Sequence, residues 1–267
     1  MRTFGTTLVI AGVLAAMVPA TMSEAASDGM TLVFSDEFAG NAEIDTASWR
    51  VYKGDGCPQL CGFGNNELQQ YTGDTRNLRI EDGVLIIEAH RREDYTSAKV
   101  TTEAMPGWTY GKISVRARLP KGLGTWPAIW MLPDSNEFGG WPKSGEIDIM
   151  EHVGFNEAVV HGTIHTEAYN GMLGTQNTGT MRVEDATSAF HVYTVEWTKE
   201  TLRWFIDDTE YHVIERKDSD TYKEWPFDKP FHLILNLAVG GDWGGREGVD
   251  EDAFPARFEI DWVRVWQ

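Results

Sequence analysis

The feature that most constrains the fold is a two-residue period in the hydrophobic pattern of many short segments. In the stretch ISVRARL, residues 113–119, every second residue is apolar, and residues 202–207 and 259–266 behave similarly. Side chains alternate between the two faces of a β-strand, so this period is typical of strands with one buried face. Clusters of Gly, Pro, Asn and Asp separate the segments, and amphipathic helical patterns of three turns are hard to find. The pattern therefore predicts a β-sandwich or barrel, and two stacked antiparallel sheets with long loops account well for the length.

The N-terminal segment is typical of a secretory signal. Arg2 precedes an apolar run at residues 8–18, and small residues before position 26 offer a cleavage site. A membrane anchor is the alternative, but the run is too short to span a bilayer comfortably. The rest of the chain shows no linker, repeat or low-complexity segment. We therefore expect a signal peptide at residues 1–25, one domain at residues 26–267, and a secreted or periplasmic location.

The charge balance is strongly acidic. The formal net charge of the 267 residues is −18. Such a surface repels nucleic acid and anionic lipid and weakly disfavours a sulfated polymer, whereas it suits a neutral substrate or simply a soluble protein from a salty habitat. We expect no nucleic-acid partner and no membrane partner. No feature of the sequence demands an oligomer, so we expect a monomer.

The two cysteines, Cys57 and Cys61, lie in the stretch CPQLC. In an exported protein a local disulfide across this loop is reasonable, and two free thiols are the alternative. A zinc site is disfavoured because no histidine neighbours them at ligand spacing. The sequence leaves the choice between disulfide and free thiols open.

The stretch SGEIDIMEHVG, residues 144–154, crowds three carboxylates into an apolar segment. In a helix, at about 100° per residue, these acids would point in three directions. In a strand, Glu146 and Asp148 share a face, but Glu151 would point to the other side. A β-bulge absorbs one extra residue and resets the phase of the side chains. We therefore predict a bulge at Ile149–Met150 that brings all three acids to one face.

Converging carboxylates raise one another's pKa, so that one can stay protonated while another is ionised. Glycoside hydrolysis uses such a pair, and carboxyls about 5–6 Å apart belong to its retaining form. A solvated acidic strand face and a calcium site are the alternatives. Four of the eleven tryptophans lie in Gly- and Pro-rich segments near these acids. Indoles exposed there suit the flat C–H faces of sugar rings, although core packing is the alternative for any single one.

The stretch GEIDIMEHVG resembles the active-site strand of glycoside hydrolase family 16, in the branch with a bulged strand. LVFSDEFAG, GNNELQQYT, YGKISVRARLPKGLGTWPAIWMLP, HVYTVEWT, LRWFIDD, LILNLAVGGDWGG and FEIDWVRVWQ resemble further blocks of the family, in order. The resemblance runs from about Thr31 to Gln267. It implies a jelly-roll β-sandwich of two curved antiparallel sheets with a concave substrate cleft.

The resemblance also implies roles for individual residues. Glu146 aligns with the catalytic nucleophile, Glu151 with the general acid/base, and Asp148 with the middle acid that orients them. The implied substrate contacts are Asn66, Arg116, Trp126 and Trp130, with Trp141, His165 and Trp243 as weaker candidates for which packing is the alternative. Catalysis in the family needs no cofactor. One structural calcium is implied at Glu37, Gly83 and Asp261.

Within the family, the blocks GNNELQQYT, GTWPAIWMLP and NLAVGGDWGG resemble those of laminarinases, which implies endo-acting hydrolysis of β-1,3-glucan. Mixed β-1,3/1,4-glucan is a second expected substrate. Agarases and carrageenases share the bulged strand, and a non-catalytic β-glucan-binding protein or a transglycosylase are further alternatives. One departure from laminarinase-like sequences is Ser114, where a glutamate is common.

Overall fold

The strands assemble into two sheets. The computed structural model describes residues 29–40 and 43–267, so the predicted signal peptide at residues 1–25 lies outside the described residues. The first sheet contains ten strands: β1 (Leu32–Asp36), β3 (Gln69–Tyr71), β4 (Leu78–Glu81), β5 (Val84–Arg91), β6 (Tyr95–Ser97), β8 (Gly111–Arg118), β13 (His191–Trp197), β14 (Thr201–Ile206), β15 (Thr209–Glu215) and β17 (Ala256–Trp266). The second contains seven: β2 (Arg50–Val51), β7 (Lys99–Thr101), β9 (Thr125–Pro133), β10 (Glu146–His152), β11 (Val159–His165), β12 (Asn177–Arg182) and β16 (Phe231–Val239).

The strand order explains how the chain closes on itself. The ten-stranded sheet runs β15-β14-β13-β8-β17-β5-β6-β3, with β1 paired to β17 and β4 to β5, and the seven-stranded sheet runs β12-β11-β10-β9-β16-β7-β2. Within the described ranges, the pairing of β3 with β6 is parallel and the other strand pairings are antiparallel. The helical elements there are short 3-10 turns: η1 (Cys61–Gly64), η2 (Gly154–Asn156) and η3 (Glu251–Ala253). The predicted sandwich of two mainly antiparallel sheets is confirmed.

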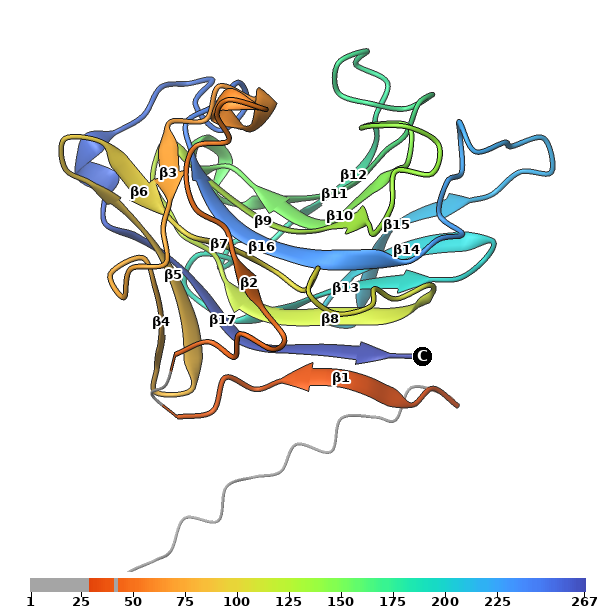
Figure 1. The fold of residues 1–267 in the computed structure, drawn as a ribbon, viewed down its shortest axis with the longest axis horizontal. Helices are drawn as coiled ribbons and strands as arrows, with labels where there is room; N and C mark the ends of the chain where they lie inside the picture. Colours follow the sequence, from red (N-terminus) through yellow and green to blue (C-terminus); the bar gives the residue numbers. More distant parts are fainter. Residues whose placement is uncertain (1–28, 41–42) are drawn as a thin grey trace, which may run out of the picture.

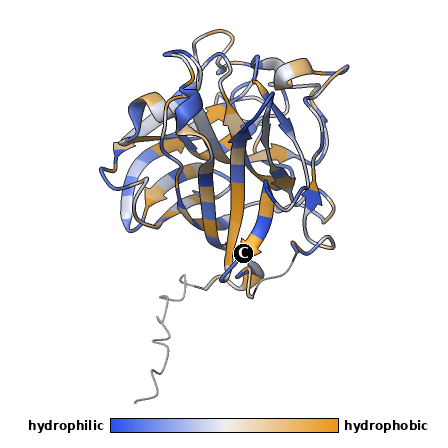
Figure 2. Cartoon of the chain, turned by 90° about the vertical axis from the view of Figure 1, so that its left-hand side faces the viewer, coloured by the Kyte–Doolittle hydropathy of each residue, from blue (hydrophilic) through white to orange (hydrophobic). Residues whose placement is uncertain are grey.

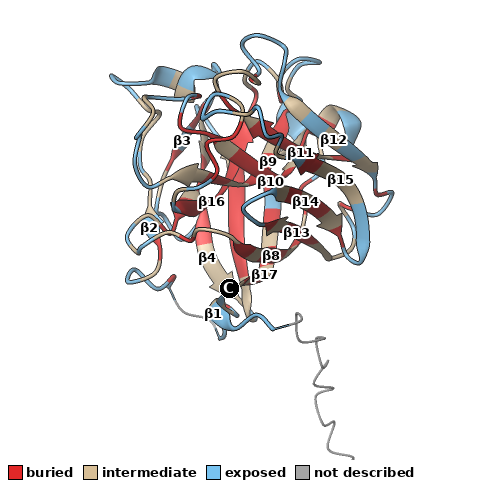
Figure 3. Cartoon of the chain, turned by 90° about the vertical axis from the view of Figure 1, so that its right-hand side faces the viewer, coloured by how far each residue is buried: buried red, intermediate tan, exposed pale blue. Residues whose placement is uncertain are grey.

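The core lies between the two sheets because one face of each strand is apolar. In β8 the buried apolar side chains are those of Ile113, Val115 and Ala117, and in β10 they include Ile147 and Ile149. Apolar segments concentrate along the strands in Figure 2, and the same strands are the buried part of the molecule in Figure 3. Burial of these side chains is the main force that holds the layers together.

The seven-stranded sheet is curved, and loops rise on both sides of its outer face (Figure 1). One of these loops contains a disulfide between Cys57 and Cys61, which settles the choice that the sequence left open. Over the described part of the chain, no helix is both long enough and apolar enough to cross a membrane.

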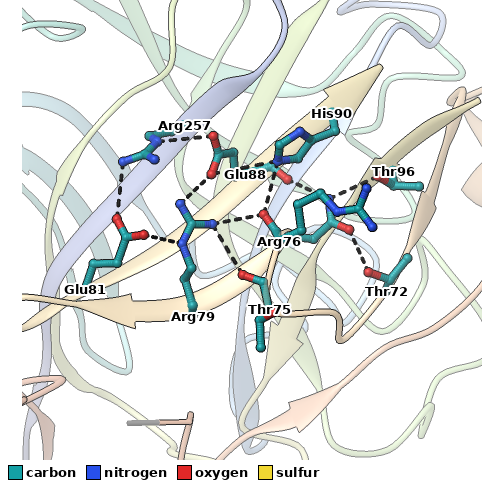
Figure 4. A network of polar contacts seen from close by, with 10 residues as sticks. Thr72, Thr75, Arg76, Arg79, Glu81, Glu88, His90, Thr96 and Arg257 are labelled. Carbon is teal, nitrogen blue, oxygen red and sulfur yellow. Dashed lines mark hydrogen bonds and ion pairs between the residues drawn. The ribbon is translucent and has the colours of Figure 1, made fainter. Parts of the chain in front are cut away.

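A network of ion pairs covers the outer face of the other sheet, where β4, β5 and β17 meet (Figure 4). Its centre is Glu88, which is 5% exposed. The Glu88 carboxylate accepts from Arg79 Nη2 at 2.5 Å and from Arg257 Nε at 3.2 Å. Both arginines also contact Glu81. Because Glu88 is buried, its charge requires these partners.

Candidate active site

The acidic strand contains the predicted bulge. Asp148 lies opposite Trp130 of β9, and Glu151 lies opposite Ala128. Three steps along β10 thus match two steps along β9, and the register with β11 shifts over the same interval. Ile149 and Met150 are at most 1% exposed and both belong to the core. The surplus residue therefore leaves Glu146, Asp148 and Glu151 together on the outer face of the curved sheet.

Each of the two glutamates accepts a hydrogen bond from an indole. Trp141 Nε1 donates to Glu146 Oε2 at 2.8 Å, and Trp126 Nε1 donates to Glu151 Oε1 at 3.0 Å. These bonds fix the orientation of the carboxyl groups and favour their ionised forms. The structure thus brings two of the tryptophans chosen from the sequence directly to the acids.

Burial dominates the electrostatics of the acidic cluster. It raises the pKa of Glu146 to about 8, with the charge of Glu151 adding to the effect, and it raises the pKa of Glu151 to about 7. Burial and the charges of both glutamates raise the pKa of Asp148 well above its usual range. The side-chain hydrogen bond between Asp148 and Glu146 raises the pKa of Asp148 and lowers that of Glu146. Near neutral pH the cluster therefore contains both protonated and ionised carboxyls.

His165 faces the same acids, and its tautomer follows from its contacts. The backbone N–H of Gly171 donates to His165 Nδ1 at 3.2 Å. Burial lowers the pKa of His165 to about 4, so the ring is neutral and its proton lies on Nε2. That nitrogen lies 3.4 Å from Asp148 Oδ2 and 3.8 Å from Glu146 Oε1. His165 therefore presents an N–H group to the acids.

Glu146, Asp148 and His165 each place one donor atom within 4.8 Å of the others, a separation compatible with a shared metal ion. A histidine that binds a metal normally donates its other ring N–H to an acceptor. Here the other nitrogen of His165 accepts from Gly171, so the proton occupies Nε2, where the metal would bind. The donor set does not fit a metal ion.

Aromatic and polar side chains continue on both sides of the acids. The ring of Trp243 meets that of Trp126 edge-on at 5.5 Å between centroids, and Trp141 lies 5.8 Å from His165. Asn66 donates to Asp242 at 2.8 Å, which places this predicted residue on the loop that meets the Trp243 loop. The predicted tryptophans Trp126, Trp141 and Trp243, together with His165, thus gather around the acids.

Trp130 is surrounded by groups that the sequence analysis missed. Its indole N–H donates to Asn236 at 2.7 Å, and the amine of Lys99 lies 4.8 Å from the ring centroid. His161, opposite Glu151, meets the ring of Trp243 at 4.9 Å. A lone Lys, Asn or His has no characteristic spacing in a sequence. These three residues lie in β7, β16 and β11, and only the order of the strands in the sheet brings them close to β9 and β10.

The prediction for Arg116 was wrong. We expected this residue near the substrate, but it lies in β8 of the ten-stranded sheet. Its neighbours Val115 and Ala117 point into the core, so alternation directs Arg116 to the opposite face of that sheet. There it pairs with Asp261 and lies 4.8 Å from the ring of Phe190. The two-residue period was correct, but it does not say which sheet a strand joins.

The three predicted calcium ligands lie near the middle of β17, where β1 ends and β5 begins. However, Arg264 forms two hydrogen bonds to the carboxylate of Glu37, at 2.8 and 3.0 Å. Asp261 is paired with Arg116, so arginines engage both of the predicted side-chain ligands. Cation ligands are ordinarily free oxygen atoms. As these side chains lie, they do not fit a calcium ion.

A hollow of about 740 Å³ lies elsewhere, lined by residues of β2 and β4 among others. None of the three acids lines it, and it contains no pair of converging carboxyls. The outer face of the curved sheet is therefore the stronger candidate for chemistry.

A two-sheet sandwich with paired acids on a bulged strand, flanked by indoles, has the chemical equipment of a glycoside hydrolase that acts through two carboxyls. The sequence profile of Glycosyl hydrolases family 16 matches residues 64–264. The chain belongs to this family.

Individual relatives agree with this assignment. The chain is 52% identical to a β-glucanase of Rhodothermus marinus, over 88% of this chain and 85% of the relative. It superposes on the laminarinase structure from Rhodothermus marinus with a TM-score of 0.85 and 52% identity, covering 89% of this chain and 97% of the other. A family 16 non-specific endo-β-1,3(4)-glucanase with a 1,3-β-D-cellobiosyl-glucose at its active site gives a TM-score of 0.85 at 39% identity, covering 90% and 96%. The jelly-roll sandwich implied by the sequence is confirmed.

Proposed function

We propose that this protein is an endo-acting β-1,3-glucanase that works with retention of configuration. The observation that carries the proposal is the bulge in β10, which puts Glu146 and Glu151 on one face with Asp148 between them. The similarity to a laminarinase over most of both chains supports β-1,3-glucan as the substrate. Mixed β-1,3/1,4-glucan is a second substrate, supported by the likeness to a non-specific endo-β-1,3(4)-glucanase.

The reaction has two steps. In the first, the Glu146 carboxylate attacks the anomeric carbon while protonated Glu151 gives its proton to the departing glycosidic oxygen; the C–O bond to the leaving sugar breaks. In the second, Glu151, now ionised, takes a proton from water, and the resulting hydroxyl attacks the anomeric carbon. The bond to Glu146 breaks, and the new reducing end has the original β configuration.

The neighbouring side chains support these steps. The hydrogen bonds of Glu146 with Trp141 and Asp148 both lower the pKa of Glu146 and so offset part of the rise that burial causes, toward the ionised form that the attack requires. Burial of Glu151 favours its protonated form, which the departure of the leaving group requires. The indoles of Trp126, Trp141 and Trp243 provide surfaces against which sugar rings can pack.

The stereochemical outcome tests the proposal. Laminarin would be digested in an NMR tube and the anomeric proton signals followed from the first minute. We expect the β-anomer of the new reducing end to appear first and the α-anomer to follow by mutarotation. First release of the α-anomer contradicts the mechanism. Glu146→Ser should bind laminarin without cutting it.

Location, oligomeric state and calcium are separate proposals. Export to the periplasm or the medium is consistent with the Cys57–Cys61 disulfide, since disulfides persist in oxidising compartments. N-terminal sequencing of the mature protein tests cleavage near residue 26, and light scattering tests the proposed monomer.

Calcium binding near Asp261 would have to displace the arginine partners described above. A calcium titration followed by thermal unfolding tests it. Stabilisation that disappears in Asp261→Asn supports the site, whereas an unchanged melting temperature shows that calcium does not bind the folded protein.

A further inference from the structure

A tryptophan of the ten-stranded sheet reaches across the core to the bulge. Trp204 of β14 is 0% exposed, and its indole Nε1 donates to the backbone carbonyl of Asp148 at 2.8 Å. Backbone carbonyls of a regular strand lie in the plane of the sheet and point to neighbouring strands. A bond from the facing sheet shows that the Asp148 carbonyl is accessible from the core. This is the residue after which the registers with both neighbouring strands shift.

The strand opposite the bulge leaves room for this indole. Gly162 of β11 lies between Thr163, which pairs with Asp148, and His161, which pairs with Glu151. A Cβ atom on Gly162 would lie 2.5 Å from Trp204 Cδ1, a distance that side chains do not tolerate. Only glycine at this position allows the indole to lie against β11.

The fit extends by one more pair. Gly162 is paired with Gly179 of β12, and a Cβ atom on Gly179 would lie 2.3 Å from the ring of His212. His212 in turn is paired with Trp204 on the facing sheet, with 4.9 Å between the ring centroids. Two adjacent glycines in one sheet thus accommodate two adjacent rings in the other. The position of the indole is fixed from both sides.

We propose that Trp204 is a positioning residue for the reaction: its indole N–H fixes the Asp148 carbonyl, and with it the bulge that sets the geometry of Glu146 and Glu151. Gly162 is the residue that admits the indole. The inference rests on the proposed function for its kinetic consequences. Its structural basis, the register at Ile149–Met150, can be measured independently.

The test compares two buried tryptophans that donate to backbone carbonyls. Trp204→Phe removes the N–H at the bulge and keeps an aromatic ring. Trp197→Phe is the matched control. Trp197 is 1% exposed, and its Nε1 donates to the Phe227 carbonyl at 3.0 Å, so this hydrogen bond does not involve β10. Both variants lose one buried hydrogen bond and similar volume, so both should have a lower melting temperature.

The kinetic expectations separate positioning from general destabilisation. For Trp204→Phe on laminarin, below the melting temperature, we expect kcat to fall about 10- to 100-fold while KM changes less than about threefold, because misplaced catalytic groups act on the transition state. Trp197→Phe should retain kcat within about threefold of the unsubstituted protein. The alkaline limb of the kcat pH profile should move to lower pH in Trp204→Phe only, because the charge of Glu151 then acts less on Glu146.

Two results overturn the inference: an unchanged kcat in Trp204→Phe, or equal losses in both variants. If Trp204→Phe does not fold, benzothienylalanine at position 204 keeps the shape of the indole without its N–H and carries the same expectations. Crystal structures of the variants read the register at Ile149–Met150 without any assay. If the unsubstituted protein does not cut laminarin, the proposed function fails. The positioning role is then still decided by the structure of the position-204 variant: an altered register supports it, and an unaltered register rejects it.

Discussion

The substitution Glu146→Gln should increase the stability of the protein, by an amount that grows with pH. Glu146 is a buried carboxyl whose pKa rises from 4.5 to about 8 on folding, chiefly through loss of solvation. Between these values the folded protein keeps a proton that the unfolded chain releases, so the wild type loses stability as pH rises. Glutamine never ionises, and its amide oxygen can still accept the Trp141 N–H.

The magnitude follows from the two pKa values. At ~1.36 kcal/mol per pKa unit, ionisation of Glu146 costs the wild type ~2 kcal/mol at pH 6 and ~4 kcal/mol at pH 8. These are upper values because Asp148 and Glu151 share the same protons. For a chain of this size the gain at pH 6 corresponds to a rise in melting temperature of about 4–8 °C.

The assay is thermal unfolding by differential scanning calorimetry at pH 5, 6, 7 and 8, in buffers of constant ionic strength. Glu93→Gln, at an exposed carboxylate, is the control and should show no such trend. A Glu146→Gln variant whose melting temperature stays parallel to that of the wild type across this range would refute the reasoning. So would a variant that is less stable at pH 7.

Three further outcomes are expected. Burial raises the pKa of the acid Glu151 to about 7 and that of the nucleophile Glu146 to about 8. The reactive pair, ionised Glu146 with protonated Glu151, is therefore most populated between these values, so kcat/KM should be bell-shaped with its maximum there; an optimum near pH 4–5 would contradict this. Glu88→Gln should lower the free energy of unfolding in urea by ~3 kcal/mol, because it leaves two arginines without their buried partner, and kcat should not change. A loss under ~1 kcal/mol would show that the network is dispensable. Gly171→Pro removes the N–H that holds the His165 tautomer, so the ¹⁵N shifts of this ring should change relative to wild type, whereas Gly171→Ala should leave them as they are; identical spectra for all three would reject the assignment.

The fold and the acidic cluster could be predicted from the sequence because both depend on local periodicity. Alternation identifies strands, and a phase error in the acidic segment identifies the bulge at Ile149–Met150. These inferences need only the order of residues along one strand.

What could not be predicted depends on which strands become neighbours. Arg116 obeys the alternation of its strand, but the strand belongs to the other sheet. The arginine that occupies the carboxylate of Glu37 is 227 residues away in sequence. Lys99 and Asn236 reach Trp130 only because β7, β16 and β9 are adjacent. Pairings over such separations leave no periodic trace in the sequence.

The bulge has a consequence for how the strand could vary. If one residue after Asp148 were deleted, the second glutamate would follow Asp148 by two positions. The side chains of the strand would then alternate regularly, and all three acids would still point to the same face of the sheet as Glu146. The surplus residue adds no functional group, since the side chains of Ile149 and Met150 both enter the interior. What it adds is a main-chain oxygen turned toward the opposite layer, and therefore a point of attachment between the working surface and the rest of the molecule.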